Sequence, residues 1–151
     1  MPIASLDDIR LLIGEEVGTS SWIAIDQERI GNFAEATEDR QFIHLDPDGA
    51  AAAGLGGTIA HGFLSLSLLS VMGAEAMVMP EGMKLVFNYG FDRVRFLAPV
   101  RSGKRIRGRF RLESVEEKRP GQFLFRHEVT VDIEGEDKPA LTATWLAMFV
   151  L

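Results

Sequence analysis

Cysteine is absent from this chain, and positive charge is scarce. Disulfides, thiolate metal sites and thiol nucleophiles are therefore excluded whatever the fold. The 16 Lys and Arg residues are outnumbered by 22 Asp and Glu residues, which gives a formal net charge of -6 and a pI near 5.1. Because a nucleic-acid binder needs a basic surface to neutralise phosphates, this balance argues against that class of protein.

Long hydrophobic runs are also missing. The most apolar stretch, residues 141–151, is shorter than the roughly 20 residues of a membrane-spanning helix, and threonine interrupts it. Residues 1–8 carry acidic rather than basic side chains and no continuous apolar segment, unlike a secretory signal. We therefore expect a cytoplasmic protein. The length of 151 residues and the 46 % hydrophobic content predict a single domain over residues 1–151.

The first part of the chain predicts short helices and one strand. Ser5 is placed to accept a hydrogen bond from the amide of Asp8 at the start of a short helix. Residues 22–25 favour a strand. Asp26 then suits the N-cap of a helix that places Asp39 just beyond its end.

Pro47 and Gly49 should break any helix through the segment that follows, so we expect Asp39 to His44 to form a loop or a single turn before a short helix at 50–53. Residues 63–72 are apolar on almost every side, which is typical of a buried helix.

The second half has the pattern of β-strands. Its β-branched and aromatic residues alternate partly with polar ones in four segments separated by Pro and Gly, namely residues 84–96, 105–117, 123–134 and 141–151. The breaks suggest consecutive antiparallel strands. Such a sheet needs an apolar element against one face, and the helix at 63–72 is long enough to supply it. The sequence therefore predicts an α+β fold in which an antiparallel sheet wraps around one central helix.

Asp39 and His44 are the strongest candidates for chemistry. A carboxylate and an imidazole held by one short loop can bind a single water from two sides and move its protons. The alternative is that Asp39 caps a turn and His44 is a satisfied buried histidine.

Gly62 is the next candidate. If the central helix begins near residues 59–61, the Gly62 amide lacks an intrahelical partner and could stabilise an oxygen that gains negative charge. Gly62 could equally serve helix packing alone. We expect a structural role for His61. The three histidines show no metal-binding spacing, so neither a zinc site nor any other metal site is predicted.

Two further features bear on binding. Ser65, Ser67 and Ser70 lie outside any G-x-S-x-G turn, so none is expected to be a nucleophile, although Ser70 could line an acyl pocket. The chain has one basic concentration, made of Arg93, Arg95, Arg101, Lys104, Arg105 and Arg107. It could bind phosphates or be a solvated strand face.

Two separated motifs resemble the MaoC-like dehydratases, the R-specific enoyl-CoA hydratases of the hot-dog fold. They are Thr37-Glu38-Asp39-Arg40-Gln41-Phe42-Ile43-His44-Leu45-Asp46-Pro47 and Thr58-Ile59-Ala60-His61-Gly62-Phe63. The segment 88–100 is similar to the strand and turn after the central helix in that family. Many members have Gly at the position of Glu38 and Asn-Pro at the positions of Gln41 and Phe42, so the path of this loop could differ.

The resemblance implies a mechanism. The carbonyl of a trans-2-enoyl thioester would bind the Gly62 amide, Asp39 would take a proton from the water that attacks C3, and His44 would orient that water and protonate C2. Which of the two residues donates and which abstracts stays open. The product would be an (R)-3-hydroxyacyl-CoA, and no cofactor is implied.

The resemblance also implies binding residues and partners. The acyl chain would run along the central helix past Ser65, Leu66 and Ser70, and the CoA phosphates would extend toward basic residues, for which we consider Arg93, Arg95 and Lys104. We expect a homodimer with acyl-CoA as its ligand and no nucleic-acid or membrane partner. The alternatives are an acyl-CoA thioesterase and a non-catalytic acyl-thioester-binding protein, because fold alone does not fix function.

Overall fold

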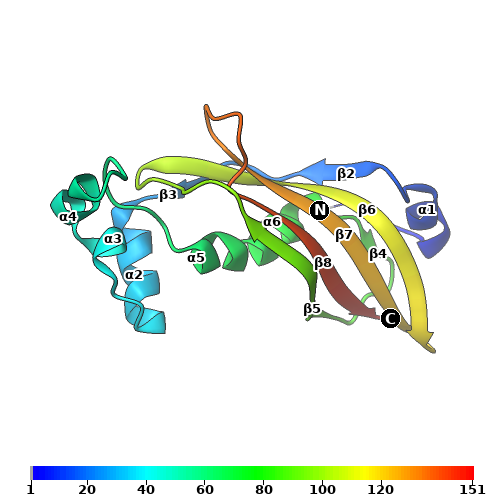
Figure 1. Cartoon of the computed structure of the whole chain (residues 1–151). Helices are drawn as coiled ribbons and strands as arrows, with labels where there is room; N and C mark the ends of the chain where they lie inside the picture. Colours follow the sequence, from blue (N-terminus) through cyan, green and yellow to red (C-terminus); the bar gives the residue numbers. More distant parts are fainter. Residues whose placement is uncertain (1) are drawn as a thin grey trace.

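A computed structural model describes residues 2–151 and shows one curved antiparallel sheet with two consecutive helices on its concave side (Figure 1). In chain order the elements are β1 (Ile3–Ala4), α1 (Leu6–Leu11), β2 (Glu16–Thr19), β3 (Ile23–Ile25), α2 (Gln27–Thr37), α3 (Phe42–Leu45), α4 (Pro47–Ala52), α5 (Gly62–Ser67), α6 (Leu69–Ala76), β4 (Met79–Pro80), β5 (Leu85–Phe96), β6 (Lys104–Arg119), β7 (Gln122–Ile133) and β8 (Leu141–Val150). The predicted α+β fold, a sheet around a central helix, is confirmed.

The six-stranded sheet has the order β2-β6-β7-β8-β5, and β3 also pairs with β6. The four long strands predicted from the sequence all form. On β6 the alternation works as expected, because Ile106, Phe110 and Leu112 are buried in the core while the arginines between them lie on the opposite face. β1 and β4 form a separate parallel pair, which the sequence did not predict.

The expectation of consecutive antiparallel strands is wrong for β5. β6, β7 and β8 do pair in order, but β5 pairs with β8 instead of β6. Pro99 and Gly103 therefore belong to a crossover between two non-adjacent strands, not to a hairpin. Turn residues predict where a chain changes direction, but they do not specify the strand beside which it continues.

Helix starts follow the predicted caps. The Ser5 hydroxyl accepts from the Asp8 amide at 3.1 Å, and the Asp26 carboxylate accepts from the Arg29 amide at 2.8 Å. Pro47 does separate α3 from α4, but it opens α4 as its first residue instead of ending a helix, because proline needs no amide hydrogen at that position. Within residues 2–151, no helix combines the length and hydropathy that a membrane span requires.

The central helix departs from prediction in two ways. It is interrupted at Leu68, which separates α5 from α6. It is also not buried on every side: Leu64, Leu69 and Met72 lie in the core, whereas Phe63 is 66 % exposed and Val71 54 % exposed. The sheet of a single chain covers only one face of the helix, so the expectation of all-round burial is wrong. An apolar flank is left uncovered.

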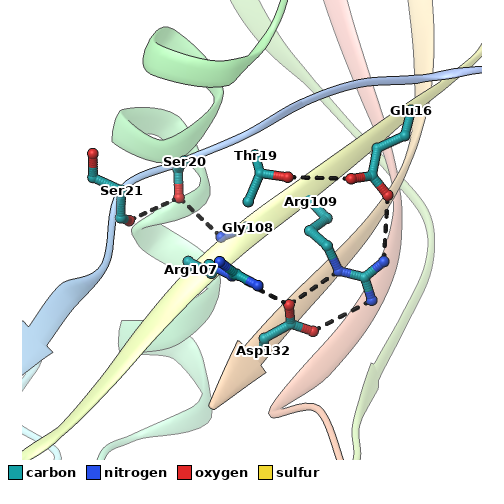
Figure 2. A network of polar contacts seen from close by, with 8 residues as sticks. All are labelled: Glu16, Thr19, Ser20, Ser21, Arg107, Gly108, Arg109 and Asp132. Carbon is teal, nitrogen blue, oxygen red and sulfur yellow. Dashed lines mark hydrogen bonds and ion pairs between the residues drawn. The ribbon is translucent and has the colours of Figure 1, made fainter. Parts of the chain in front are cut away.

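Arg107 and Arg109 of β6 lie on the outer face of the sheet and face acidic partners (Figure 2). Asp132 lies between Arg107, at 3.5 Å, and Arg109, at 3.0 Å, and Arg109 also reaches Glu16 at 3.3 Å. The hydrogen bond from Arg109 to Asp132 raises the pKa of the Arg109 guanidinium further above its ordinary value. Arg107 and Arg109 thus connect β6 to carboxylates on the neighbouring strands β7 and β2.

Candidate active site

A sharp change of direction after α2 places the predicted acidic residue. Helix α2 ends at Thr37, and Glu38 takes the left-handed conformation with φ 64°. Among the described residues it is the one non-glycine residue with positive φ. This conformation ends a helix and redirects the chain, so half-buried Asp39 starts the irregular segment that leads into the single turn of α3.

His44 lies on that turn and is held by main-chain contacts. Its ring is 5 % exposed, and Nδ1 lies 2.7 Å from the carbonyl oxygen of Ile59. Because a carbonyl only accepts, Nδ1 carries the hydrogen and the lone pair of the neutral ring is on Nε2. The side-chain amide of Gln27 donates to the His44 carbonyl at 2.8 Å and fixes the turn to α2.

His61 joins the same group from the segment before α5. Its ring, 3 % exposed, stacks on His44 with centroids 3.7 Å apart and planes inclined by 24°. Its Nε2 lies 2.9 Å from the carbonyl oxygen of Asp39. One carboxylate oxygen of Asp39 and one nitrogen of each histidine all lie within 4.8 Å of one another. The structure thus brings Asp39 and His44 together, as predicted, and adds His61.

An aspartate and two histidines also raise the question of a metal ion. Nδ1 of His44 and Nε2 of His61 already face carbonyl oxygens, which leaves one nitrogen on each ring. The lone pairs of those nitrogens lie in the ring planes, and the planes of two stacked rings run side by side. The ligand atoms of Asp39, His44 and His61 lie within 4.8 Å of one another, a spacing compatible with one shared ion as well as with one shared water.

Gly62 is the first residue of α5, directly after His61. Within residues 2–151, no carbonyl or side chain accepts a hydrogen bond from its amide. An added Cβ would lie 3.0 Å from the ring of Phe96, so a larger residue here would have to displace that ring from the cavity wall. The amide is therefore free to donate to a ligand oxygen.

A cavity of about 430 Å³ lies beside these groups. His44, Gly62 and Ser65 line it, and most of the remaining wall is apolar, made of Ile43, Ile59, Ala60, Phe63, Phe96, Leu97, Ala98, Pro99, Val100 and Ala140. Its size and composition are those of a small-molecule site with a few placed polar groups. Asp39 does not line the cavity. Its carboxylate lies next to His44, which does line it.

The other predicted pocket residues lie further along the helix. Leu66 and Ser70 line a separate hollow of about 170 Å³ between the central helix and β5. Phe63 borders both this hollow and the main cavity. The predicted pocket residues thus fall into two adjoining spaces rather than one.

The three basic residues considered for phosphates do not line the cavity. Lys104 pairs with Glu136 at 3.3 Å, Arg95 donates to the carbonyl of Val94 at 2.9 Å, and Arg93 lines a hollow beside Glu128. Their role in phosphate binding stays a prediction.

The third histidine lies apart from the site, in the sheet. His127 on β7 is 1 % exposed, and burial lowers its pKa to about 4. Its Nδ1 has no hydrogen-bond partner within the described chain. His127 is therefore a neutral core residue under ordinary conditions.

Sequence reasoning missed the far wall of the cavity and the contacts of His61. The wall comes from residues 96–100 and from Ala140, which the crossover after β5 brings opposite α5. The available signal was the apolar content of this segment around Pro99, which is unusual for an exposed turn. No local signal revealed that His61 would stack on His44, because the two residues lie on different segments.

The fold is that of a hot-dog protein with a carboxylate and two histidines beside an apolar cavity, and comparison with known proteins gives the family. The sequence model of the family described as "MaoC like domain" matches residues 9–133, and the chain belongs to this family. It is thus related to a family of hydratases and dehydratases, which are hydro-lyases.

Two relatives align over almost the whole chain. "Nodulation protein N" of Rhizobium meliloti is 53 % identical over 145 residues, covering 95 % of this chain and 90 % of the relative. "3-hydroxyacyl-thioester dehydratase Z" of Mycobacterium tuberculosis is 43 % identical over 146 residues, covering 97 % and 96 %. Among solved structures, the "(R)-hydratase from A. caviae involved in PHA biosynthesis" superposes with a TM-score of 0.71 at 24 % identity, over 87 % of this chain and 95 % of that chain, which supports the fold.

Proposed function

We propose that this protein hydrates trans-2-enoyl-CoA to (R)-3-hydroxyacyl-CoA and catalyses the reverse dehydration. One observation carries the proposal. A carboxylate oxygen of Asp39 and a ring nitrogen of His44 lie within 4.8 Å of each other, beside an apolar cavity and the unpaired amide of Gly62. A water that makes two hydrogen bonds of about 2.8 Å at a tetrahedral angle joins atoms roughly 4.5 Å apart, which agrees with this spacing. The name of the mycobacterial relative, a 3-hydroxyacyl-thioester dehydratase, supports the same chemistry.

In the proposed reaction the thioester carbonyl accepts a hydrogen bond from the Gly62 amide, which draws electrons from C3. The water between Asp39 and His44 adds its oxygen to C3 as its proton passes to the pair. The pair then returns one proton to C2 and is restored. Neutral His44 has only a lone pair at Nε2, so the ring can protonate C2 only after it has taken a proton. Addition from the single face that bears both groups is syn and gives one enantiomer, which the resemblance to R-specific hydratases assigns as R.

The cavity and the neighbouring hollow suggest where the acyl chain and the CoA part of the substrate bind. The reacting enoyl group occupies the cavity beside Ser65, and a longer acyl chain passes Phe63 into the hollow that Leu66 and Ser70 line. The CoA phosphates extend outward toward Arg93, Arg95 and Lys104, which flank the wall segment 96–100 in the chain. Arg101 joins this set, because it lies directly after Val100 and makes no ion pair within the described chain.

We further propose that two copies assemble through β5. This strand pairs only with β8 among the described residues, and its other edge has no partner. It exposes large apolar residues on both faces, with Val86 at 47 % on the face toward α6 and Phe87 at 52 % on the opposite face. An unpaired apolar edge favours pairing with an identical strand, and a second copy placed there would also lie against the uncovered flank of α5 and α6.

The test of activity is the loss of enoyl absorbance when purified protein meets crotonyl-CoA, followed by chiral analysis of the product. Rapid loss with formation of the R-3-hydroxyacyl thioester is expected. Asp39→Asn and His44→Gln should each lower kcat by at least about 100-fold, because positioned acid–base groups typically contribute 10²–10⁴-fold. Asp48→Asn, an exposed acid on α4, and His127→Phe are the matched controls and should retain activity.

Each of the other outcomes would indicate a different function or mechanism. Release of free CoA would indicate a thioesterase. Saturable binding of enoyl-CoA without turnover on either a short or a longer chain would indicate a binding protein. Full activity of both Asp39→Asn and His44→Gln would exclude the proposed mechanism even if hydration is observed.

A further inference from the structure

His61 contacts both acid–base residues at once. Its Nε2 lies 2.9 Å from the carbonyl oxygen of Asp39, and its ring stacks on His44 at 3.7 Å. Phe33 also contacts the ring, with centroids 4.9 Å apart, so the orientation of the imidazole is fixed by two neighbouring rings. Gly62, the third group of the proposed site, is the next residue along the chain. One buried ring therefore connects the parts of the site that come from separate segments.

The hydrogen bond to Asp39 explains why this ring is polar. Because a carbonyl only accepts, Nε2 of His61 carries the hydrogen. Nδ1 is then an acceptor, and it is buried without a partner within the described chain. A buried polar atom without a hydrogen bond is unfavourable, and a phenyl ring would fill the same space without that penalty. Packing alone would favour an apolar ring here, so the donor at Nε2 is the property that distinguishes histidine at this position.

Asp39 has few other contacts to hold its main chain. Within residues 2–151 its amide has no hydrogen-bond partner, and its carbonyl accepts only from His61. The neighbouring Arg40 pairs with Glu35 at 2.9 Å, but both side chains are exposed, and exposed ion pairs constrain a loop weakly. The fixed point of this segment is therefore the buried ring of His61.

We infer that His61 is a positioning residue for the proposed reaction: its N–H holds the backbone of Asp39, and its face holds the ring of His44, at the separation that one bridging water requires. The inference rests on the proposed function. It assigns His61 no contact with substrate, and it goes beyond the structural role expected from the sequence because it ties the residue to the rate of the chemical step.

Two substitutions separate the donor from the ring. His61→Phe keeps a ring between Phe33 and His44 but removes the N–H, and it should lower kcat on crotonyl-CoA about 100-fold with little change in KM, since a misplacement of about 1 Å can have that effect. His61→Gln keeps an N–H donor and should recover at least about tenfold of that loss. His127→Phe makes the same substitution at an equally buried histidine outside the site and should leave kcat within about twofold of the parent.

A second measurement tests how firmly residues 36–44 are held, and it does not depend on activity. Amide hydrogen exchange in residues 36–44 should be about tenfold faster in His61→Phe than in the parent, with recovery in His61→Gln and no change in His127→Phe. If the parent hydrates no enoyl-CoA, the proposed function fails, and the exchange experiment still decides whether His61 holds Asp39.

If His61→Phe does not fold, His61→Ala with added ligands replaces it. Imidazole, which carries an N–H, should restore kcat and slow exchange, whereas thiazole, a ring of similar size without an N–H, should not. The inference is overturned if folded His61→Phe keeps kcat within about threefold of the parent, if His61→Gln is no better than His61→Phe, or if the two added rings act alike.

Discussion

At the scale of single residues, the three histidines show how surroundings decide chemistry. All are at least nine-tenths buried. His44 and His61 each donate to a main-chain carbonyl, which fixes the tautomer and directs the other nitrogen. His127 pairs across the sheet with Leu112 and Trp145, which offer no charge to stabilise an imidazolium. Burial therefore lowers its pKa to about 4 from an ordinary value of 6.5.

His127 should make the fold less stable in acid. Between pH 6.5 and about 4 the unfolded chain binds a proton at this residue while the folded chain does not, so the free energy of unfolding falls as pH falls through that range. The loss amounts to at most about 3–4 kcal/mol, since one pKa unit corresponds to about 1.4 kcal/mol. Above pH 6.5 both states are neutral at His127 and the effect vanishes.

Urea unfolding of the parent and of His127→Phe at several pH values measures this term. The variant should lose less stability than the parent between pH 6.5 and 4, and the two should run parallel above pH 6.5. Carboxylates such as Glu134, whose pKa is lowered by its hydrogen bond with Arg105, also lose stabilising contacts in acid. Because both proteins contain these carboxylates, their contribution cancels when the two stabilities are compared. Equal slopes from pH 6.5 to 4 would show that His127 is not the buried neutral group described here.

At the scale of secondary-structure elements, close packing of α6 on the sheet depends on a glycine. A Cβ added at Gly73 would lie 2.7 Å from Cζ3 of Trp145 and 2.9 Å from the sulfur of Met77. Trp145 belongs to β8 and is 5 % exposed, so it has little room to move. Gly31 on α2 offers the opposite case, because nothing lies within 4 Å of an added Cβ there.

Gly73→Ala and Gly31→Ala therefore should have opposite effects on stability. The first overpacks the contact between α6 and β8 and should lower the free energy of unfolding by about 1–3 kcal/mol. The second should raise it by about 0.4–1 kcal/mol, because alanine restricts the unfolded chain and fits the helix. Chemical denaturation gives both values when the three proteins are fitted with the same dependence of the free energy of unfolding on denaturant concentration. A neutral Gly73→Ala would mean that α6 can move away from Trp145 without loss.

At the scale of the whole molecule, the β5 edge of the sheet is an exposed apolar surface. β5 exposes apolar side chains along its length, and the adjacent flank of the central helix exposes Phe63 and Val71. The hollow lined by Leu66 and Ser70 lies between these two elements. A second copy on β5 would therefore cover the space assigned to longer acyl chains as well as the sheet edge.

Phe87→Lys should separate the proposed dimer. A lysine on an edge strand opposes strand pairing, and loss of a central aromatic contact of about 2 kcal/mol or more weakens association at least about thirtyfold. Light scattering during gel filtration should give the mass of two chains for the parent and of one for the variant.

Leu11→Lys is the matched control, because Leu11 is 79 % exposed on α1 and lies outside the strand. It should leave the mass of two chains unchanged. A parent that elutes as a single chain would contradict the proposed assembly, and a dimeric Phe87→Lys would place the interface elsewhere.

Much of this architecture was readable in the sequence, because it depends on short-range rules. The caps at Ser5 and Asp26 need only a side-chain oxygen placed three residues before an amide. The strand alternation of β6 follows from a period of two. The spacing of Asp39 and His44 on one loop, followed by Gly62, left catalytic and structural roles open, and the resemblance that these motifs carry indicated the family and favoured the catalytic roles.

What only the tertiary structure decided concerns contacts between segments far apart in sequence. The pairing of β5 with β8 instead of β6 sends residues 96–100 across α5, where they form the wall of the cavity. The stack of His61 on His44 and its bond to Asp39 arise because two separate segments meet, and no local pattern encodes that meeting. The flank of the central helix is likewise exposed because the sheet of one chain covers only one face of the helix. Local sequence fixes the conformation of each segment, whereas the site depends on long-range packing that is set by the whole chain.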